Sequence, residues 1–284
     1  MKKIENLVSI IIPTFNEGKN IEKCINSLLE QSYQSIEIII VDDGSTDNTK
    51  EILLKLSSEK SELKILGQSH LGPALARNKG SKEAKGGILV FMDADMTFDK
   101  DFIKELVKPI NEGKYKGTFS KNEYISNWQN IWSRCWNYNL DLPPKKMIPD
   151  NYPDEGFDFR AILKDEFLRI NGFDDIGYTD TWSLSQKLGY KPNLVAGAEY
   201  YHNNPDNLRE VFTQSKWVSK REYRFGFVGI LFALVRSSLP ASLLLGLFKV
   251  IEHKEIRFIF FKVVYDLGSF LGILEMKFTK KHIK

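Results

Sequence analysis

The first 95 residues alternate apolar runs with segments of helical periodicity, and this alternation limits the folds that the chain can adopt. Runs rich in Ile, Val and Leu, which read as strands buried on both faces, occupy residues 7–12, 36–43, 63–66 and 88–92. The intervening segments with helical spacing of apolar residues are 20–31, 48–59 and 72–86. This order predicts an α/β fold with a mostly parallel sheet and helices on both faces.

Polar segments follow three of these predicted strands directly. They read PTFNE after the first strand, DDGSTDNT after the second and DAD after the fourth. Right-handed crossovers bring the carboxyl ends of parallel strands to one edge of a sheet, where open α/β sheets bind ligands. The sequence therefore predicts a ligand site at that edge.

The two aspartates of the DAD segment, Asp93 and Asp95, indicate a metal site. Carboxylate oxygens suit Mg²⁺ or Mn²⁺, and Mg²⁺ in proteins is typically held by one or two carboxylates together with substrate phosphates. A calcium-binding loop is excluded because Phe98 stands where that loop needs glycine and Lys104 where it needs glutamate. Helix capping by either aspartate is the alternative structural role.

Composition excludes several other classes of protein. The net charge of +3 is too small to indicate a nucleic-acid partner. Cys24 and Cys135 form neither a metal-binding spacing nor a disulfide framework, which fits a reducing compartment. The chain has no P-loop motif and no glycine-rich dinucleotide fingerprint after the first strand. The apolar run near the N-terminus is too short for a signal-peptide core.

The C-terminal part is apolar and basic. Apolar runs at residues 225–235, 237–248 and 256–274 are interrupted or flanked by lysines and arginines. Basic flanks beside apolar helices are typical of a segment lying on an anionic membrane surface, which we expect here. The alternatives are an ordinary helical subdomain and a spanning or re-entrant hairpin. The runs 225–235 and 237–248 together reach the roughly 20 residues of a membrane span only if Arg236, which separates them, is tolerated in the membrane.

Four segments together resemble the inverting family 2 glycosyltransferases of the GT-A fold. They are SIIIPTFNE (9–17), IEIIIVDDGSTDNT (36–49), GPALARNKG (72–80) and VFMDAD (90–95), in the family's order and at its usual separations. The resemblance is strong over residues 5–110 and looser over 156–225. We predict a nucleotide-sugar-binding half at residues 1–115, an acceptor-binding half at 116–215 and a C-terminal helical region at 216–284.

The resemblance implies a nucleotide-diphosphate sugar donor, most often a uridine one. By position it implies that Asp95 ligates an Mg²⁺ or Mn²⁺ ion bridging the diphosphate, with His202 as a second metal or diphosphate ligand. The residues implied to contact the donor are Pro13, Thr14, Glu17, Asp43, Arg77 and Asp93.

An acceptor hydroxyl needs one general base in this family, and the segment GFDDIGYTDTW carries the candidates. The family's Glu-Asp pair is Thr179-Asp180 here, so the base role falls to Asp180, with Asp175 as the alternative. The absent glutamate leaves this assignment open. The C-terminal helices suggest a saccharide acceptor linked to lipid, and an enzyme on the cytoplasmic face of the cell membrane, peripheral or monotopic.

Three rival functions remain from the sequence. A polyprenyl-phosphate sugar synthase would share the donor site but need no base, because its phosphate acceptor is already ionised; Arg221 or Arg224 would bind that phosphate. A silent binding scaffold is disfavoured by the retained Arg77, Asp93 and Asp95. A nucleotidyltransferase is disfavoured because PTFNEGKN is not a glycine-rich basic segment.

Overall fold

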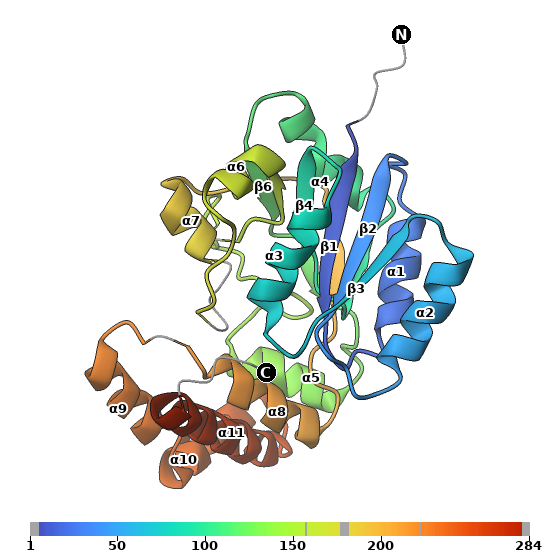
Figure 1. Cartoon of the computed structure of the whole chain (residues 1–284). Coiled ribbons are helices and arrows are strands. Elements are labelled where there is room, and N and C mark those ends of the chain that lie inside the picture. Colours follow the sequence, from blue (N-terminus) through green and yellow to red (C-terminus); the bar gives the residue numbers. More distant parts are fainter. Residues whose placement is uncertain (1–5, 157, 177–181, 222, 280–284) are drawn as a thin grey trace. The chain divides into compact units, whose positions relative to one another are not determined.

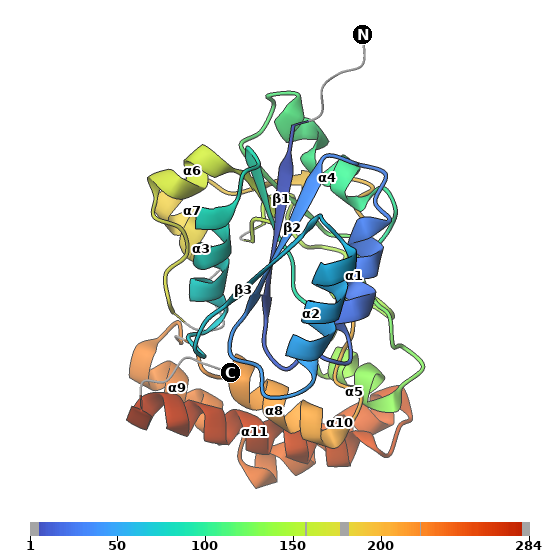
Figure 2. The same cartoon turned by 45° about the vertical axis from the view of Figure 1, so that its right-hand side comes forward.

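The computed structural model describes residues 6–156, 158–176, 182–221 and 223–279, and it divides into two compact units (Figures 1 and 2). The first unit comprises residues 1–124, 151–175 and 180–202. The second comprises residues 125–150, 176–179 and 203–284. The division predicted from the sequence, with boundaries after residues 115 and 215, stays a prediction.

A seven-stranded sheet forms the centre of the first unit, in the order β3-β2-β1-β4-β8-β6-β9. Its strands are β1 (Val8–Thr14), β2 (Ile36–Asp42), β3 (Leu63–Gly67), β4 (Ile88–Phe91), β6 (Gly117–Ser120), β8 (Ala161–Leu163) and β9 (Asn193–Val195). The pairs β1–β2, β1–β4, β2–β3 and β6–β9 are parallel, and only β8 runs antiparallel to its neighbours β4 and β6. The predicted α/β fold with a mostly parallel sheet is confirmed.

The apolar strands have helices on both faces, as Figures 1 and 2 show. Along β1, Ile10 and Ile12 pack into one core cluster while Ile11 packs into the other, because successive side chains of a strand point to opposite faces. The helices of the first face are α1 (Ile21–Leu29), α2 (Thr49–Glu59) and α4 (Phe102–Asn111). Those of the second face are α3 (Pro73–Glu83), α6 (Lys164–Arg169) and α7 (Trp182–Leu188).

A second, three-stranded sheet lies in the same unit, in the order β5-β10-β7. It consists of β5 (Met96–Phe98), β10 (Tyr200–His202) and β7 (Glu123–Ile125). The central strand β10 pairs antiparallel with β5, and His202 lies opposite Met96. This register brings His202 beside the residue that precedes β5, which is Asp95.

A short strand and a short helix follow each other between residues 161 and 169. Residues Ala161–Leu163 form β8, and α6 covers Lys164–Arg169. The three residues of β8 complete the sheet between β4 and β6. A strand of three residues is too short to produce a recognisable pattern of apolar residues in the sequence.

Five helices make up most of the second unit. They are α5 (Ile131–Asn139), α8 (Leu208–Val218), α9 (Gly226–Arg236), α10 (Leu239–His253) and α11 (Phe258–Thr279). A small core of Cys135, Trp136, Val211, Phe258 and Phe261 joins α5, α8 and α11. Among the described residues no single helix is long and apolar enough to span a membrane; α9 and α10 together meet that criterion but are bent by 65° at their junction.

An ion pair is buried in α11. Lys262 Nζ lies 2.9 Å from Asp266 Oδ1, and the two side chains are only 5% and 4% exposed. Replacing Lys262 by methionine is expected to lower the free energy of unfolding by about 3–5 kcal/mol, because Asp266 would be left buried without its partner. The double variant Lys262→Met/Asp266→Leu should recover much of this loss. Urea unfolding of the three proteins checks the expectation, and an equal loss in the single and double variants would contradict it.

Candidate functional site

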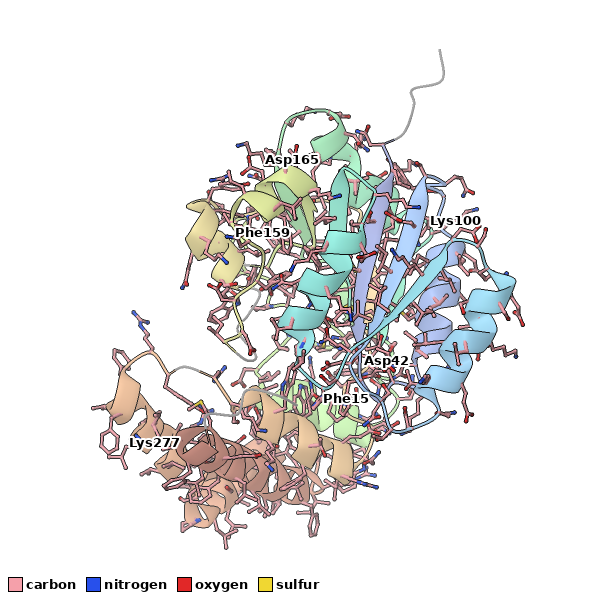
Figure 3. All side chains as sticks on the ribbon, viewed as in Figure 1. Phe15, Asp42, Lys100, Phe159, Asp165 and Lys277 are labelled. Atoms are coloured by element: carbon pink, nitrogen blue, oxygen red, sulfur yellow. The ribbon has the colours of Figure 1, made fainter. Side chains whose placement is uncertain are left out.

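The carboxyl ends of β1 and β2 lie at one edge of the main sheet, as the parallel register requires. In Figure 3 the labels Phe15 and Asp42 mark this edge, and Asp165 lies toward the other end of the same sheet. Strand β4 ends here too, since it is parallel to β1 and pairs with it up to Phe91. The polar segments that follow these strands therefore meet, as predicted.

Asn16 joins the two loops that follow β1 and β2. Its backbone N–H donates to Ser45 Oγ at 2.9 Å. Its side-chain oxygen accepts from the backbone N–H groups of Thr46 at 2.8 Å and Asp47 at 3.3 Å. Asn16 has a φ of 56°, a left-handed conformation that asparagine adopts more readily than most residues. The two loops consequently form one connected edge.

Asp43, the second acid of the predicted nucleoside site, organises the segment that leads into α3. One carboxylate oxygen accepts from Gln68 Nε2 at 2.7 Å and from the backbone N–H of Leu71 at 2.8 Å. The other accepts from the backbone N–H of Gly72 at 2.9 Å and lies 3.1 Å from His70 Nδ1. Asp43 is 3% exposed, so these bonds compensate a buried charge. Its predicted contact with the base or ribose stays a prediction.

Three predicted donor contacts come from the end of β1. Pro13 lies opposite Val41 of β2, and Thr14 is the last residue of the strand. Thr14 Oγ1 is buried and has no hydrogen-bond partner among the described residues. Glu17 lies in the turn that precedes α1: its carbonyl accepts from the backbone N–H of Asn20, and its carboxylate accepts from Asn20 Nδ2 at 3.1 Å. The contacts of these residues with a nucleoside stay predictions.

Asp93 lies between two arginines. Its Oδ1 accepts from Arg77 Nη2 at 2.8 Å, and its Oδ2 lies 3.5 Å from Arg160 Nη1. Arg77 stacks over Phe173, and Arg160 over Tyr200, with guanidinium carbon to ring-centre distances of 5.6 and 5.3 Å. Burial acts to raise the pKa of Asp93, but the charges of Arg77 and Arg160 hold that pKa well below its usual range. Asp93 is therefore an anchored, permanently charged group.

Arg160 is a site residue that the sequence analysis missed. It immediately precedes β8, and its carbonyl accepts from the N–H of Phe91, the last residue of β4. No motif marks this arginine, because the short antiparallel strand that carries it is itself invisible in the sequence. Its place beside Asp93 follows only from the pairing of β8 with β4.

Asp95 faces His202, the second predicted metal ligand. His202 Nε2 lies 3.0 Å from Asp95 Oδ2, and the other ring nitrogen, Nδ1, lies 3.0 Å from Glu123 Oε1. Burial acts to lower the pKa of His202, but the two carboxylates raise it well above its ordinary value. The structure thus brings together both predicted metal-binding residues and adds Glu123, which the sequence analysis missed.

These residues fit a divalent cation that shares its ligands with a substrate. Among the residues that the structure describes, no group of three or more His, Cys, Asp or Glu side chains is arranged to hold a metal by itself. Asp95 and His202 supply one oxygen and one nitrogen donor, and Mg²⁺ or Mn²⁺ bound to a nucleotide completes its coordination with phosphate oxygens and water. The carboxylate of Glu123 on the far nitrogen of His202 is the arrangement that metal-ligating histidines usually have.

The predicted base, Asp180, lies outside the described residues. The alternative, Asp175, is exposed and follows a segment fixed to α3. Asn78 of α3 donates from Nδ2 to the carbonyl of Phe173 and accepts from its N–H, both at 2.9 Å. Gly172 has a φ of 70°, and a Cβ there would lie 2.2 Å from Asn78 Oδ1. The Gly-Phe-Asp-Asp segment is therefore held beside α3, the helix that carries Arg77.

Solved structures share this fold. The mannosyltransferase PcManGT from Pyrobaculum calidifontis, in complex with GDP-Man and Mn²⁺, superposes with a TM-score of 0.60 at 16% identity, covering 97% of this chain and 88% of that one. S. aureus TarS 1–349 in complex with UDP-GlcNAc superposes with a TM-score of 0.55 at 17% identity, covering 97% and 92%. The expected GT-A architecture is thus confirmed.

Curated sequences of the same kind match the N-terminal part. Glycosyltransferase GlyG of Streptococcus pneumoniae is 36% identical over 110 residues, which are 38% of this chain and 36% of that protein. Glycosyltransferase AglE of Haloferax volcanii is 38% identical over 107 residues, covering 37% of this chain and 35% of that protein. The match therefore spans little more than a third of each relative.

A family profile covers more of the chain than these pairwise matches do. The profile described as glycosyl transferase family 2 matches residues 9–169, which is more than half of the 284 residues. All four motifs quoted above lie within that range. The chain belongs to glycosyl transferase family 2.

Proposed function

We propose that the protein is an inverting, metal-dependent glycosyltransferase that moves a sugar from a nucleotide-diphosphate sugar to a hydroxyl group of a saccharide. The observation that carries the proposal is the convergence, at one edge of the sheet, of the anchored Asp93 with its two arginines and of Asp95 with His202. Cationic side chains and metal-binding donors side by side suit the diphosphate of such a donor. TarS with UDP-GlcNAc and PcManGT with GDP-Man share the fold, and the sequence motifs favour a uridine nucleotide.

Each residue has a separate task in this proposal. Arg77 binds the base or the diphosphate, and Asp93 binds the ribose. Pro13, Thr14, Glu17 and Asp43 line the nucleoside. Asp95 and His202 hold Mg²⁺ or Mn²⁺, which when bound neutralises the charge of the departing diphosphate. The departing diphosphate needs no proton, so a single base suffices. Asp180 is that base: it removes the proton of the acceptor hydroxyl while the hydroxyl oxygen attacks the sugar from the side opposite the diphosphate.

The donor is identified by a panel of UDP-, GDP- and dTDP-sugars. Free nucleoside diphosphate released with Mn²⁺ or Mg²⁺ is the readout, with water as the acceptor. We expect one donor, a UDP-sugar, to be hydrolysed only with a metal present. If the enzyme hydrolyses no donor in the absence of its acceptor, the binding of UDP is measured by titration calorimetry instead. We expect that binding to depend on the metal. Absence of both hydrolysis and binding would overturn the proposed function.

The second unit carries the features on which we base a membrane location. Large apolar side chains are exposed along α9, α10 and α11, among them Phe227 (67%), Phe232 (69%), Phe248 (62%) and Ile251 (70%). Cations border them: Lys277 Nζ, on a residue labelled in Figure 3, lies 4.9 Å from the centre of the Phe227 ring. Apolar side chains beside cations complement an anionic lipid surface. We propose that the enzyme is peripheral or monotopic on the cytoplasmic face of the cell membrane and that its acceptor is lipid-linked.

Vesicle binding tests this location. The variant Phe227→Glu/Phe232→Glu should bind vesicles of phosphatidylcholine and phosphatidylglycerol at least about 100-fold more weakly than wild type, since burying each phenylalanine is worth roughly 1.5–3 kcal/mol. Leu54→Glu, which changes a 57% exposed leucine of α2, is the matched control and should bind normally. If the wild-type protein does not bind vesicles and instead forms dimers through α9, α10 and α11, the exposed apolar side chains are a protein interface.

A further inference from the structure

Glu123 is a buried carboxylate for which the proposed reaction has no direct use. It is 8% exposed, and the charge of a carboxylate is costly in such a setting unless it is compensated. Its Oε1 lies 3.0 Å from His202 Nδ1, and its Oε2 accepts from the hydroxyl of Tyr200 at 3.0 Å. Both carboxylate oxygens of Glu123 are therefore engaged in hydrogen bonds.

The three-stranded sheet explains why these groups meet. Tyr200 and His202 are two residues apart on β10, so their side chains leave the strand on the same face. The neighbouring strand on one side, β7, carries Glu123, and on the other side β5 is preceded by Asp95. The imidazole of His202 thus stands between two carboxylates, with a different ring nitrogen facing each one.

The two carboxylates occupy different surroundings. Asp95 follows Asp93 by two residues and belongs to the metal-binding edge, whereas Glu123 is closed in by Tyr200, which is 1% exposed. A metal ligand needs a free lone pair, so Nε2 can bind a cation next to Asp95 only while the ring proton sits on Nδ1. An acceptor fixed at Nδ1 selects that tautomer.

We propose that Glu123 is a positioning residue that accepts a hydrogen bond from the Nδ1–H of His202 and so presents Nε2 to the divalent cation held with Asp95. This inference rests on the proposed metal-dependent function. It adds a residue that acts through His202 and touches neither the donor nor the metal. Tyr200 supports the arrangement by holding the second oxygen of Glu123.

The test compares Glu123→Gln with Tyr200→Phe. Glutamine keeps the shape of the side chain but loses the charge, and phenylalanine removes only the hydroxyl that Glu123 accepts. The readout is the dissociation constant of Mn²⁺ in the presence of UDP, followed by the paramagnetic spectrum of free Mn²⁺. We expect Glu123→Gln to weaken Mn²⁺ binding about 10–100-fold, the usual cost of altering such a partner. Tyr200→Phe should weaken it less, because the bond between Glu123 and His202 stays in place. At saturating Mn²⁺ the variant's kcat should return toward the wild-type value, because the metal ligands themselves are intact.

The outcomes separate the two claims. If wild type itself binds no Mn²⁺ with UDP, the proposed metal dependence fails. If wild type binds Mn²⁺ and Glu123→Gln binds it equally well, or if both variants lose the same affinity, Glu123 acts by packing alone and the inference is overturned. Should Glu123→Gln not fold, nitrogen-15 spectra of wild type with UDP and Mg²⁺ decide the matter: a proton on Nδ1 of His202 is expected, and a proton on Nε2 contradicts the inference.

Discussion

Sugar transfer by the Asp95→Ala variant is expected to fall by about 10²–10³-fold in kcat, the cost of losing one stabiliser of the charge that develops in a transition state. Asp95 faces His202, with its Oδ2 lying 3.0 Å from Nε2. Asp93, two residues earlier, is already neutralised by Arg77 and Arg160. The two aspartates thus have different partners, and alanine at position 95 removes one carboxylate without releasing the arginines.

Asp165→Ala is the matched control for this variant. Asp165 is an exposed acid of the same unit, at the start of α6 and away from the strand edge marked by Phe15 and Asp42 in Figure 3. It should leave the rate of donor turnover unchanged. The measurement is nucleoside diphosphate release at several Mn²⁺ concentrations. Retained, metal-dependent turnover in Asp95→Ala would show that the cation binds elsewhere.

Asp180→Asn is expected to lower the rate by about 10²–10⁴-fold when the acceptor is a hydroxyl, the range that general base catalysis contributes. Asparagine keeps the size of the side chain but cannot take the proton. A phosphate acceptor is already ionised, so transfer to a polyprenyl phosphate should be almost unaffected. Donor hydrolysis, in which water is the nucleophile, and transfer to a long-chain polyprenyl phosphate are measured side by side.

The pattern of loss identifies both the base and the acceptor class. Asp175→Asn is the companion variant, since Asp175 is the alternative base and lies in the same segment. A loss in Asp175→Asn with none in Asp180→Asn would move the base role to Asp175. Efficient transfer to the polyprenyl phosphate that survives both substitutions would favour the rival polyprenyl-phosphate sugar synthase.

The sequence predicted the parallel half of the fold because buried parallel strands are long apolar runs. β1 and β2 have seven residues each, and their periodic helices follow at once. The segments from residue 101 to 163 were harder, since β6, β7 and β8 have only three or four residues each. The helix α4 was also not predicted, although its apolar residues at positions 102, 103, 106, 107 and 110 have helical spacing.

The same contrast holds for the site. Asp93, Asp95 and Arg77 were recognisable because each lies in one of the four motifs, VFMDAD or GPALARNKG. Arg160 and Glu123 were not, because what makes them part of the site is strand pairing between segments far apart in the chain. Nothing in the residues next to either of them in the sequence distinguishes it from an ordinary surface charge.

The small sheet β5-β10-β7 also determines when, during protein synthesis, Asp95 and His202 can come together. His202 lies 107 residues after Asp95, and β10 is the central strand of that sheet. During synthesis the strands β1 to β4 leave the ribosome before β10 does. The contact between Asp95 and His202 can form only after residue 202 has emerged from the ribosome. A nascent chain therefore cannot assemble the proposed cation site until it is more than 202 residues long.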